Sequence, residues 1–356
     1  MGSCITQKKN ISTIKIINIQ KDIQNTDQND QQVLIQNTLP EKPQENQQVQ
    51  KEKNEGEIDK NFKLSLLNNQ ILNQKKENTL NLNLRKSDIN IEKATAIQIQ
   101  LKECQNLAHF TLDLSESKIS NTSLFWIGVG LSSCTNLIQL ELILNQNNIT
   151  CFEVKQLLQG AIICEQVNIL KIHLEQNSNF LFSADIQDGF ISLGKFRNLQ
   201  KLDLNLRKCQ IGDKGIKIIG DELKSCINIT NLILNLSCQN RITDKGLIEL
   251  CNGLSKNLKS LTLDFSDQNY IGDNGLCALG YTIENCFNLQ IFIINLSQNW
   301  IFYRGAFGLF TKLRNHSRLT TLEINLEQNY VRSKGQKYVK VQSLKMIRLV
   351  NKNIKY

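Results

Sequence analysis

Short runs of alternating apolar residues recur along most of this chain at a spacing of about 30 residues. Alternation with a period of two over so short a run is typical of a β-strand with one buried face. A unit of this size buries its apolar face only against its neighbours, so the sequence predicts an array of stacked units. Nine such runs begin at Leu80, Phe110, Leu140, Leu170, Leu202, Leu232, Leu261, Phe292 and Leu322.

The segment between successive runs is predicted to be helical. Apolar residues recur in it at i, i+3, i+7 and i+10, which is the stripe of an amphipathic helix with one buried side. Six stripes are clear. They are Ala94, Ile97, Leu101 and Cys104; Leu124, Ile127, Leu131 and Cys134; Val154, Leu157, Ala161 and Cys164; Ile216, Ile219, Leu223 and Cys226; Leu276, Leu279, Ile283 and Cys286; and Ala306, Leu309, Leu313 and His316.

Two kinds of polar residue mark the turns of the units. A small polar residue follows most of the apolar runs, and we expect its side chain to hydrogen-bond the backbone of the next unit. Examples are Asn147, Cys209, Asn299 and Asn329. An aspartate lies two residues before a glycine at three predicted helix starts, where its carboxylate can cap that helix. These are Asp213, Asp244 and Asp273.

The combined pattern resembles the leucine-rich repeat family, and within it the long-repeat, ribonuclease-inhibitor-like subtype. The stretch Leu-x-Leu-x-x-Cys-x-Ile-x-Asp-x-Gly runs from Leu204 to Gly215, and looser copies begin at Leu234, Leu263 and Ile294. The resemblance implies an α/β fold, a right-handed solenoid of about nine strand–helix repeats with parallel strands inside and helices outside. It covers residues 80–335, although the fourth unit has no clear Asp-x-Gly. Residues 61–79 are a possible N-terminal cap, and residues 336–356 form a basic C-terminal cap or tail.

Residues 1–60 have a different composition from the rest. They hold 18 Asn and Gln, both prolines of the chain and no aromatic residue. Such a segment cannot bury enough apolar surface to offset its conformational entropy, so we predict a disordered tether. Its first six residues, Met-Gly-Ser-Cys-Ile-Thr, fit the pattern for N-myristoylation on Gly2. Cys4 is then a candidate for palmitoylation, and two acyl chains give stable membrane attachment where one does not.

No constellation of residues indicates catalysis. Five of the 11 cysteines occupy the same inward helix position, where a free thiol behaves as a small buried apolar group. The chain has no Cys-x-x-Cys pair, and its three histidines show no metal-ligand spacing. Phosphate-binding, kinase and serine-hydrolase motifs are also missing. The sequence therefore predicts a non-enzymatic protein without cofactor, metal or small-molecule substrate.

The strand residues that alternate with the apolar runs are predicted to form the concave face, where proteins of this family usually bind partners. Together with the residues just after each run they carry seven acidic side chains against three basic ones, on a chain of net charge +9. A protein partner with a basic surface suits this face, and nucleic acid is disfavoured. The candidate binding residues are Asp113, Glu141, Lys171, His173, Asp203, Arg207, Asp264, Glu323 and Glu327.

Positive charge is concentrated at the other end of the chain. Residues 331–356 hold eight Lys and Arg and no acid, so this end can also rest on anionic lipid. We therefore expect a scaffold or adaptor that presents its concave face at the cytoplasmic side of the plasma or ciliary membrane. Two other functions remain open: a soluble component of a cytoskeletal or ciliary assembly, and an activator of a small GTPase, which rests on fold analogy alone. A third alternative is that the chain corresponds to the repeat half of a larger signalling protein with a separate catalytic half.

Overall fold

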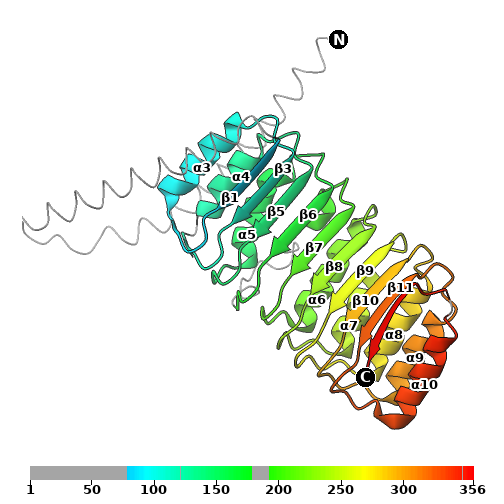
Figure 1. The fold of residues 1–356 in the computed structure, drawn as a ribbon. Helices are drawn as coiled ribbons and strands as arrows, with labels where there is room; N and C mark the ends of the chain where they lie inside the picture. Colours follow the sequence, from blue (N-terminus) through cyan, green and yellow to red (C-terminus); the bar gives the residue numbers. More distant parts are fainter. Residues whose placement is uncertain (1–77, 121, 179–191, 347) are drawn as a thin grey trace, which may run out of the picture. The chain divides into compact units, whose positions relative to one another are not determined.

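One layer of parallel strands and one layer of helices make up the repeating part of the chain in a computed structural model (Figure 1). The structure describes residues 78–120, 122–178, 192–346 and 348–356. The predicted disordered tether, the sites Gly2 and Cys4 and nearly all of the possible cap at 61–79 lie outside these residues. The α/β class predicted from the sequence is confirmed, as is the alternation of strands with helices.

All nine predicted strands lie side by side in a parallel sheet of ten. Each pairs with its neighbours in register, so that Leu140 of one strand lies opposite Phe110 and Leu170 of the next two. The ten strands are β1 (Thr79–Asn83), β3 (His109–Asp113), β5 (Gln139–Ile143), β6 (Ile169–His173), β7 (Lys201–Asn205), β8 (Asn231–Asn235), β9 (Ser260–Asp264), β10 (Ile291–Asn295), β11 (Thr321–Asn325) and β12 (Asn351–Lys355). Two further short strands, β2 (Asp88–Ile89) and β4 (Lys118–Ile119), pair separately.

The tenth strand, β12, was not predicted from the sequence. β12 pairs with β11 and places Ile354 opposite Ile324, but its other inward position holds Lys352 instead of an apolar residue. The alternation that identified the other strands is therefore incomplete here. The Nζ of Lys352 donates to the carbonyl of Ser343, 3.2 Å away, at the end of the preceding helix.

The helices pack against one face of the sheet and against each other in chain order. Every residue of the six predicted stripes is buried, which confirms them. The helices are α3 (Ile91–Glu103), α4 (Ser123–Leu131), α5 (Cys151–Ala161), α6 (Gly212–Ser225), α7 (Asp244–Gly253), α8 (Asp273–Glu284), α9 (Tyr303–Leu313) and α10 (Arg332–Leu344), with a short 3-10 helix, η2 (Leu193–Lys195), in the fourth unit.

Asparagine side chains connect the units at the turns, but they bond the preceding unit instead of the next one. The Oδ1 of Asn177 accepts from the backbone N–H groups of Asn147 and Ile149, and its Nδ2 donates to the carbonyls of Leu144 and Leu174. The same cross-unit bonds recur at Asn147, Asn240, Asn269, Asn299 and Asn329. The ladder expected from the sequence is present, and the expected direction was wrong.

The predicted aspartate caps also act between units. Asp213 lies in the first turn of α6, yet its carboxylate accepts from the backbone N–H groups of Thr243 and Gly246 at the start of α7. Asp244 and Asp273 bond the starts of α8 and α9 in the same way, through Gly272 and Phe302. Each acid therefore caps the following helix, whereas the sequence analysis assigned it to its own. Linear spacing placed the acid in the correct turn but carried no information about its partner.

Candidate functional site

On the face of the sheet that the helices leave uncovered, the strands carry seven of the nine candidate binding residues, and the other two, Arg207 and Glu327, follow the ends of β7 and β11. Along β5, β7 and β9, for example, the inward residues are buried and the outward ones stay partly or fully exposed. Because the strands are parallel and in register, outward residues of equal position form rows across the sheet. One row contains Glu141, Lys171, Asp203, Ile233, Thr262, Ile293 and Glu323. We call this row, together with the other candidate binding residues on the same strands and turns, the sheet-face site.

The candidates on β5, β6 and β7 pair with one another. The Nζ of Lys171 lies 3.0 Å from the Oε2 of Glu141 on the neighbouring strand. The Nε2 of His173 lies 3.7 Å from the Oδ1 of Asp203 on the other side. These four side chains are one-fifth to one-third exposed, and the charge of Glu141 is compensated by Lys171 within the sheet. A ligand at this end must therefore compete with existing ion pairs.

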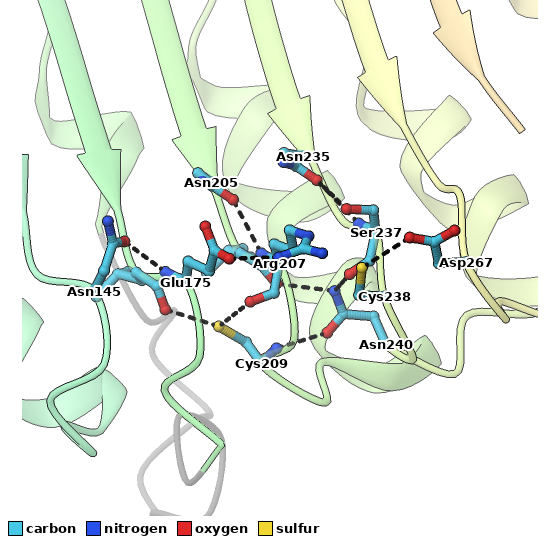
Figure 2. Close-up of polar contacts among 12 residues, drawn as sticks. Asn145, Glu175, Asn205, Arg207, Cys209, Asn235, Ser237, Cys238, Asn240 and Asp267 are labelled. Carbon is cyan, nitrogen blue, oxygen red and sulfur yellow. Dashed lines mark hydrogen bonds and ion pairs between the residues drawn. The ribbon is translucent and has the colours of Figure 1, made fainter. Parts of the chain in front are cut away.

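A third pair follows the ends of β6 and β7 (Figure 2). The Nη1 of Arg207 lies 2.6 Å from the Oε1 of Glu175, and this carboxylate raises the pKa of the arginine. Their backbone N–H groups donate to asparagine side chains, that of Arg207 to Asn205 and that of Glu175 to Asn145. Each of the two turns that carry this pair is thus held by a hydrogen bond to an asparagine side chain. Arg207 is a fixed partner of Glu175 and is only one-third exposed.

Two of the acidic candidates support the turns at the ends of their strands. The Oδ1 of Asp113 accepts from the backbone N–H of Ser115, and that of Asp264 accepts from the N–H and hydroxyl of Ser266. Asn83, Asn205, Asn235, Asn295 and Asn325 make the same turn contact at the equivalent position. This position has a local structural role that its place in the sequence did not indicate.

The apolar residues at the centre of the row are outward strand positions in the sequence pattern, but the candidates chosen from that pattern are all acidic or basic. Ile233 is 43% exposed and Ile291 is 37% exposed, while Ile293 is partly exposed. They lie on β8 and β10, between Asp203 on β7 and Glu323 on β11. Their signal was in the sequence, since isoleucine occupies strand positions where the other units have polar residues. Within the described residues, Asp264, Glu323 and Glu327 form no ion pair, in contrast to the acids on β5 and β7.

The cysteines of the helix layer are placed where thiols have little reactivity. Burial raises the pKa of Cys134, Cys164 and Cys226 to about 12, so these groups stay protonated at neutral pH. Across the described parts of the chain, no three His, Cys, Asp or Glu side chains are grouped so that they could hold a metal ion. His316 is buried and its Nε2 contacts the carbonyl oxygen of Cys286 at 2.9 Å.

In the described segments, none of the helices has both the length and the apolar character needed to span a bilayer. Comparison of the chain with models of known protein families finds no match, and comparison with curated proteins likewise finds none.

Proposed function

We propose that this chain is a non-enzymatic scaffold or adaptor that binds a protein partner on the sheet-face site. The observation that carries the proposal is the row formed by Asp203, Ile233, Thr262, Ile293 and Glu323. Exposed isoleucines flanked by carboxylates on a rigid parallel sheet supply both an apolar anchor and a charged margin. Protein interfaces combine these two elements, with apolar contacts at the centre and polar groups at the rim.

The charges favour a partner with a basic surface. On β9 to β11 the carboxylates of Asp264, Glu323 and Glu327 have no basic partner within the described chain, so they attract cationic side chains. On β5 to β7 the carboxylates of Glu141 and Asp203 already have partners. The partner is therefore expected to contact mainly the strands β7 to β11. Nucleic acid does not suit this acidic margin.

Site-specific photo-crosslinking tests this proposal. A photoreactive amino acid replaces Ile293 in one protein and Ile227 in another, and each is expressed in the source cell. Ile227 is a matched control because it is 70% exposed but follows the end of α6, outside the strands of the sheet. We expect one protein to be crosslinked from position 293 and not from position 227.

The affinity of the purified partner for variants of the chain then tests which side chains of the sheet-face site bind it. Ile293→Ser should weaken its affinity about tenfold, since loss of a central apolar anchor costs more than about 1 kcal/mol. Glu323→Lys should weaken it further at low salt, whereas Ile227→Ser should leave it unchanged. Equal crosslinking from both positions, or an affinity insensitive to Ile293→Ser and Glu323→Lys, would contradict the sheet-face site.

We further propose that acylation attaches the chain to the cytoplasmic face of the plasma or ciliary membrane. The support is the N-terminal hexapeptide with Gly2 and Cys4. Mass spectrometry of the N-terminal peptide from native protein should find myristoyl on Gly2 and thioester-linked palmitoyl on Cys4. Gly2→Ala should move the protein from the membrane to the soluble fraction. A free or merely acetylated terminus would leave a soluble scaffold.

The fold itself is proposed to be a right-handed leucine-rich-repeat solenoid of the ribonuclease-inhibitor-like type. Its support is the motif at Leu204 to Gly215 together with the regular alternation of parallel strands and helices. An experimental structure of residues 78–356 would test the handedness and the assignment of each repeat.

A further inference from the structure

Three exposed aromatic side chains lie together in the turns that follow β10 and β11. Trp300 is 55% exposed, Phe302 44% and Tyr330 49%. The rings of Phe302 and Tyr330 are stacked with centroids 5.0 Å apart, and Trp300 meets Tyr330 edge-on at 6.3 Å. An exposed cluster of this kind is more than the scattered apolar residues of an ordinary surface. We call these three residues the aromatic cluster.

The last helix, α10, begins two residues after Tyr330 and presents a basic outer side. Arg332, Lys334, Lys337, Lys340 and Lys345 are all exposed. Lys337, Val341 and Leu344 follow the spacing of one helix stripe, and on it Val341 is 42% exposed and Leu344 63%. Within the described residues, the element that comes after α10 is the strand β12 and not another helix. Val341 and Leu344 thus supply exposed apolar side chains beside lysines, which is a combination that suits contact with the interface of a membrane.

Most of these positive charges are available to a ligand. Two basic groups near the C-terminus are used inside the fold, since Arg348 donates to the carbonyls of Leu313 and Arg314 and Lys352 donates to Ser343. Among the described residues, no carboxylate forms an ion pair with the five exposed basic residues of α10 and its flanks. Residues 331–356 contain no acid at all. The surface therefore has a positive charge without internal compensation.

We infer that the aromatic cluster and the outer side of α10 together form a contact surface for an anionic lipid bilayer. Trp and Tyr favour the headgroup level of a membrane, and lysines beside them attract anionic headgroups. The composition argues against an acidic protein as the occupant, because protein interfaces are depleted of lysine and four of the five exposed basic residues are lysines. The inference rests on the proposed function for its cellular setting, although the surface is separate from both the acyl sites and the sheet-face site.

Trp300 itself can report the contact. The chain has two tryptophans, so Trp126→Phe leaves Trp300 as the only one. The full chain with this change is produced without acyl groups and titrated with phosphatidylcholine vesicles that contain or lack phosphatidylserine. We expect a blue shift of Trp300 fluorescence and co-sedimentation only with the phosphatidylserine vesicles.

Charge variants test the basic side of the surface. The triple change Lys337→Glu, Lys340→Glu and Lys345→Glu should weaken binding by about a hundredfold, since each lysine near an anionic surface contributes about a factor of five. A matched control changes the exposed Lys102, Lys118 and Lys256 to Glu, which alters the net charge equally but far along the sequence. It should bind within a few-fold of the parent. Circular dichroism confirms that both variants are folded.

Three outcomes would overturn the inference: no blue shift with phosphatidylserine vesicles, equal losses in the two triple variants, or equally strong binding to soluble poly-glutamate, which would assign the surface to an acidic protein. The use of unacylated protein separates this result from the anchoring proposal. The unacylated protein can fail to bind the vesicles although Gly2 is acylated in cells. It can equally bind the vesicles although Gly2 carries no lipid in cells. The binding of the protein partner to the sheet-face site is not affected by either result.

Discussion

The backbone N–H of Gly246 donates to the carboxylate of Asp213, 33 residues earlier, at 3.1 Å. A Cβ at position 246 would lie 2.5 Å from the same Oδ1 atom, so only glycine allows the acid to reach the start of α7. The arrangement repeats: added Cβ atoms at Gly275 and Gly305 would meet the side chains of Asp244 and Asp273. In each Asp-x-Gly motif, the aspartate therefore contacts the next unit, and the glycine leaves room for the aspartate of the previous unit.

This relationship predicts that Asp213→Ala destabilises the array. The variant loses the bonds from the N–H groups of Thr243 and Gly246 and from the Thr243 hydroxyl. Loss of a helix cap with several acceptor contacts should lower the free energy of unfolding by about 2 kcal/mol in urea denaturation. Asp221→Ala is the control, because that acid forms only surface ion pairs with Lys217 and Lys224 and should cost less than about 0.5 kcal/mol. Equal midpoints for the two variants would show that the cap between units has no stabilising role.

A second prediction concerns the close approach of α4 and α5. A Cβ at Gly160 would lie 1.6 Å from the carbonyl oxygen of Gly128, which is backbone and cannot move aside alone. Gly160→Ala should therefore force the two helices apart and lower the free energy of unfolding by about 3 kcal/mol. Gln159→Ala, next to it on the partly exposed side of α5, should stay within about 0.5 kcal/mol of the parent. A Gly160→Ala protein with unchanged thermal stability would contradict the helix packing described here.

The buried thiols lead to a third prediction. Burial raises the pKa of Cys134, Cys164 and Cys209 to about 12, so at pH 8 only about one such thiol in ten thousand is ionised. Native protein treated with iodoacetamide should show almost no modification at these cysteines by peptide mass spectrometry. Cys277 is only partly buried and should react first among the described cysteines. Denatured protein should react at all of them, which is the control for intrinsic reactivity. Rapid native modification of Cys164 would mean that the helix layer opens readily.

Much of this fold could be predicted from the sequence because each unit repeats one local pattern. The alternation at Leu202, Leu204 and Leu206 reports a buried strand side directly, and the helix stripes do the same at their own period. The strand β12 was not predicted because Lys352 occupies a position where the alternation requires an apolar residue. Lysine is tolerated there because its amine reaches the carbonyl of Ser343, a contact that no local pattern contains.

The candidate site was predictable in position but not in chemistry. Alternation correctly placed Lys171 and Asp203 on the uncovered side of the sheet. It could not indicate that Glu141 is already paired, since that depends on which strands are neighbours and in what register. The alternation also placed Ile233 on this side, but the candidates were chosen by charge, and the exposure of an apolar side chain cannot be read from the sequence. Such distinctions require the cross-strand contacts that the folded sheet creates.

The last prediction concerns how the stability of the fold depends on acid pH. It involves His316, which occupies the helix-end position that holds a cysteine in several other units. The Nε2 of His316 contacts the carbonyl oxygen of Cys286, much as the thiol of Cys164 donates to the carbonyl of Leu131. Burial lowers the pKa of His316 below its usual 6.5; the contact with the Cys286 carbonyl opposes this shift, and the nearby Arg348 adds to it. The unfolded chain therefore binds a proton at this residue more readily than the folded chain, so folded stability is lost as the pH falls below about 6.5.

His316→Cys should remove this contribution while keeping a donor at the position. Its melting temperature should fall less than that of the parent between neutral pH and about pH 5.5, as measured by differential scanning calorimetry. His109→Asn is the control, because that residue lies partly exposed on β3 and is not part of this contact. It should retain the pH dependence associated with His316. If His316→Cys loses as many degrees on acidification as the parent, protonation of His316 is not what destabilises the C-terminal units.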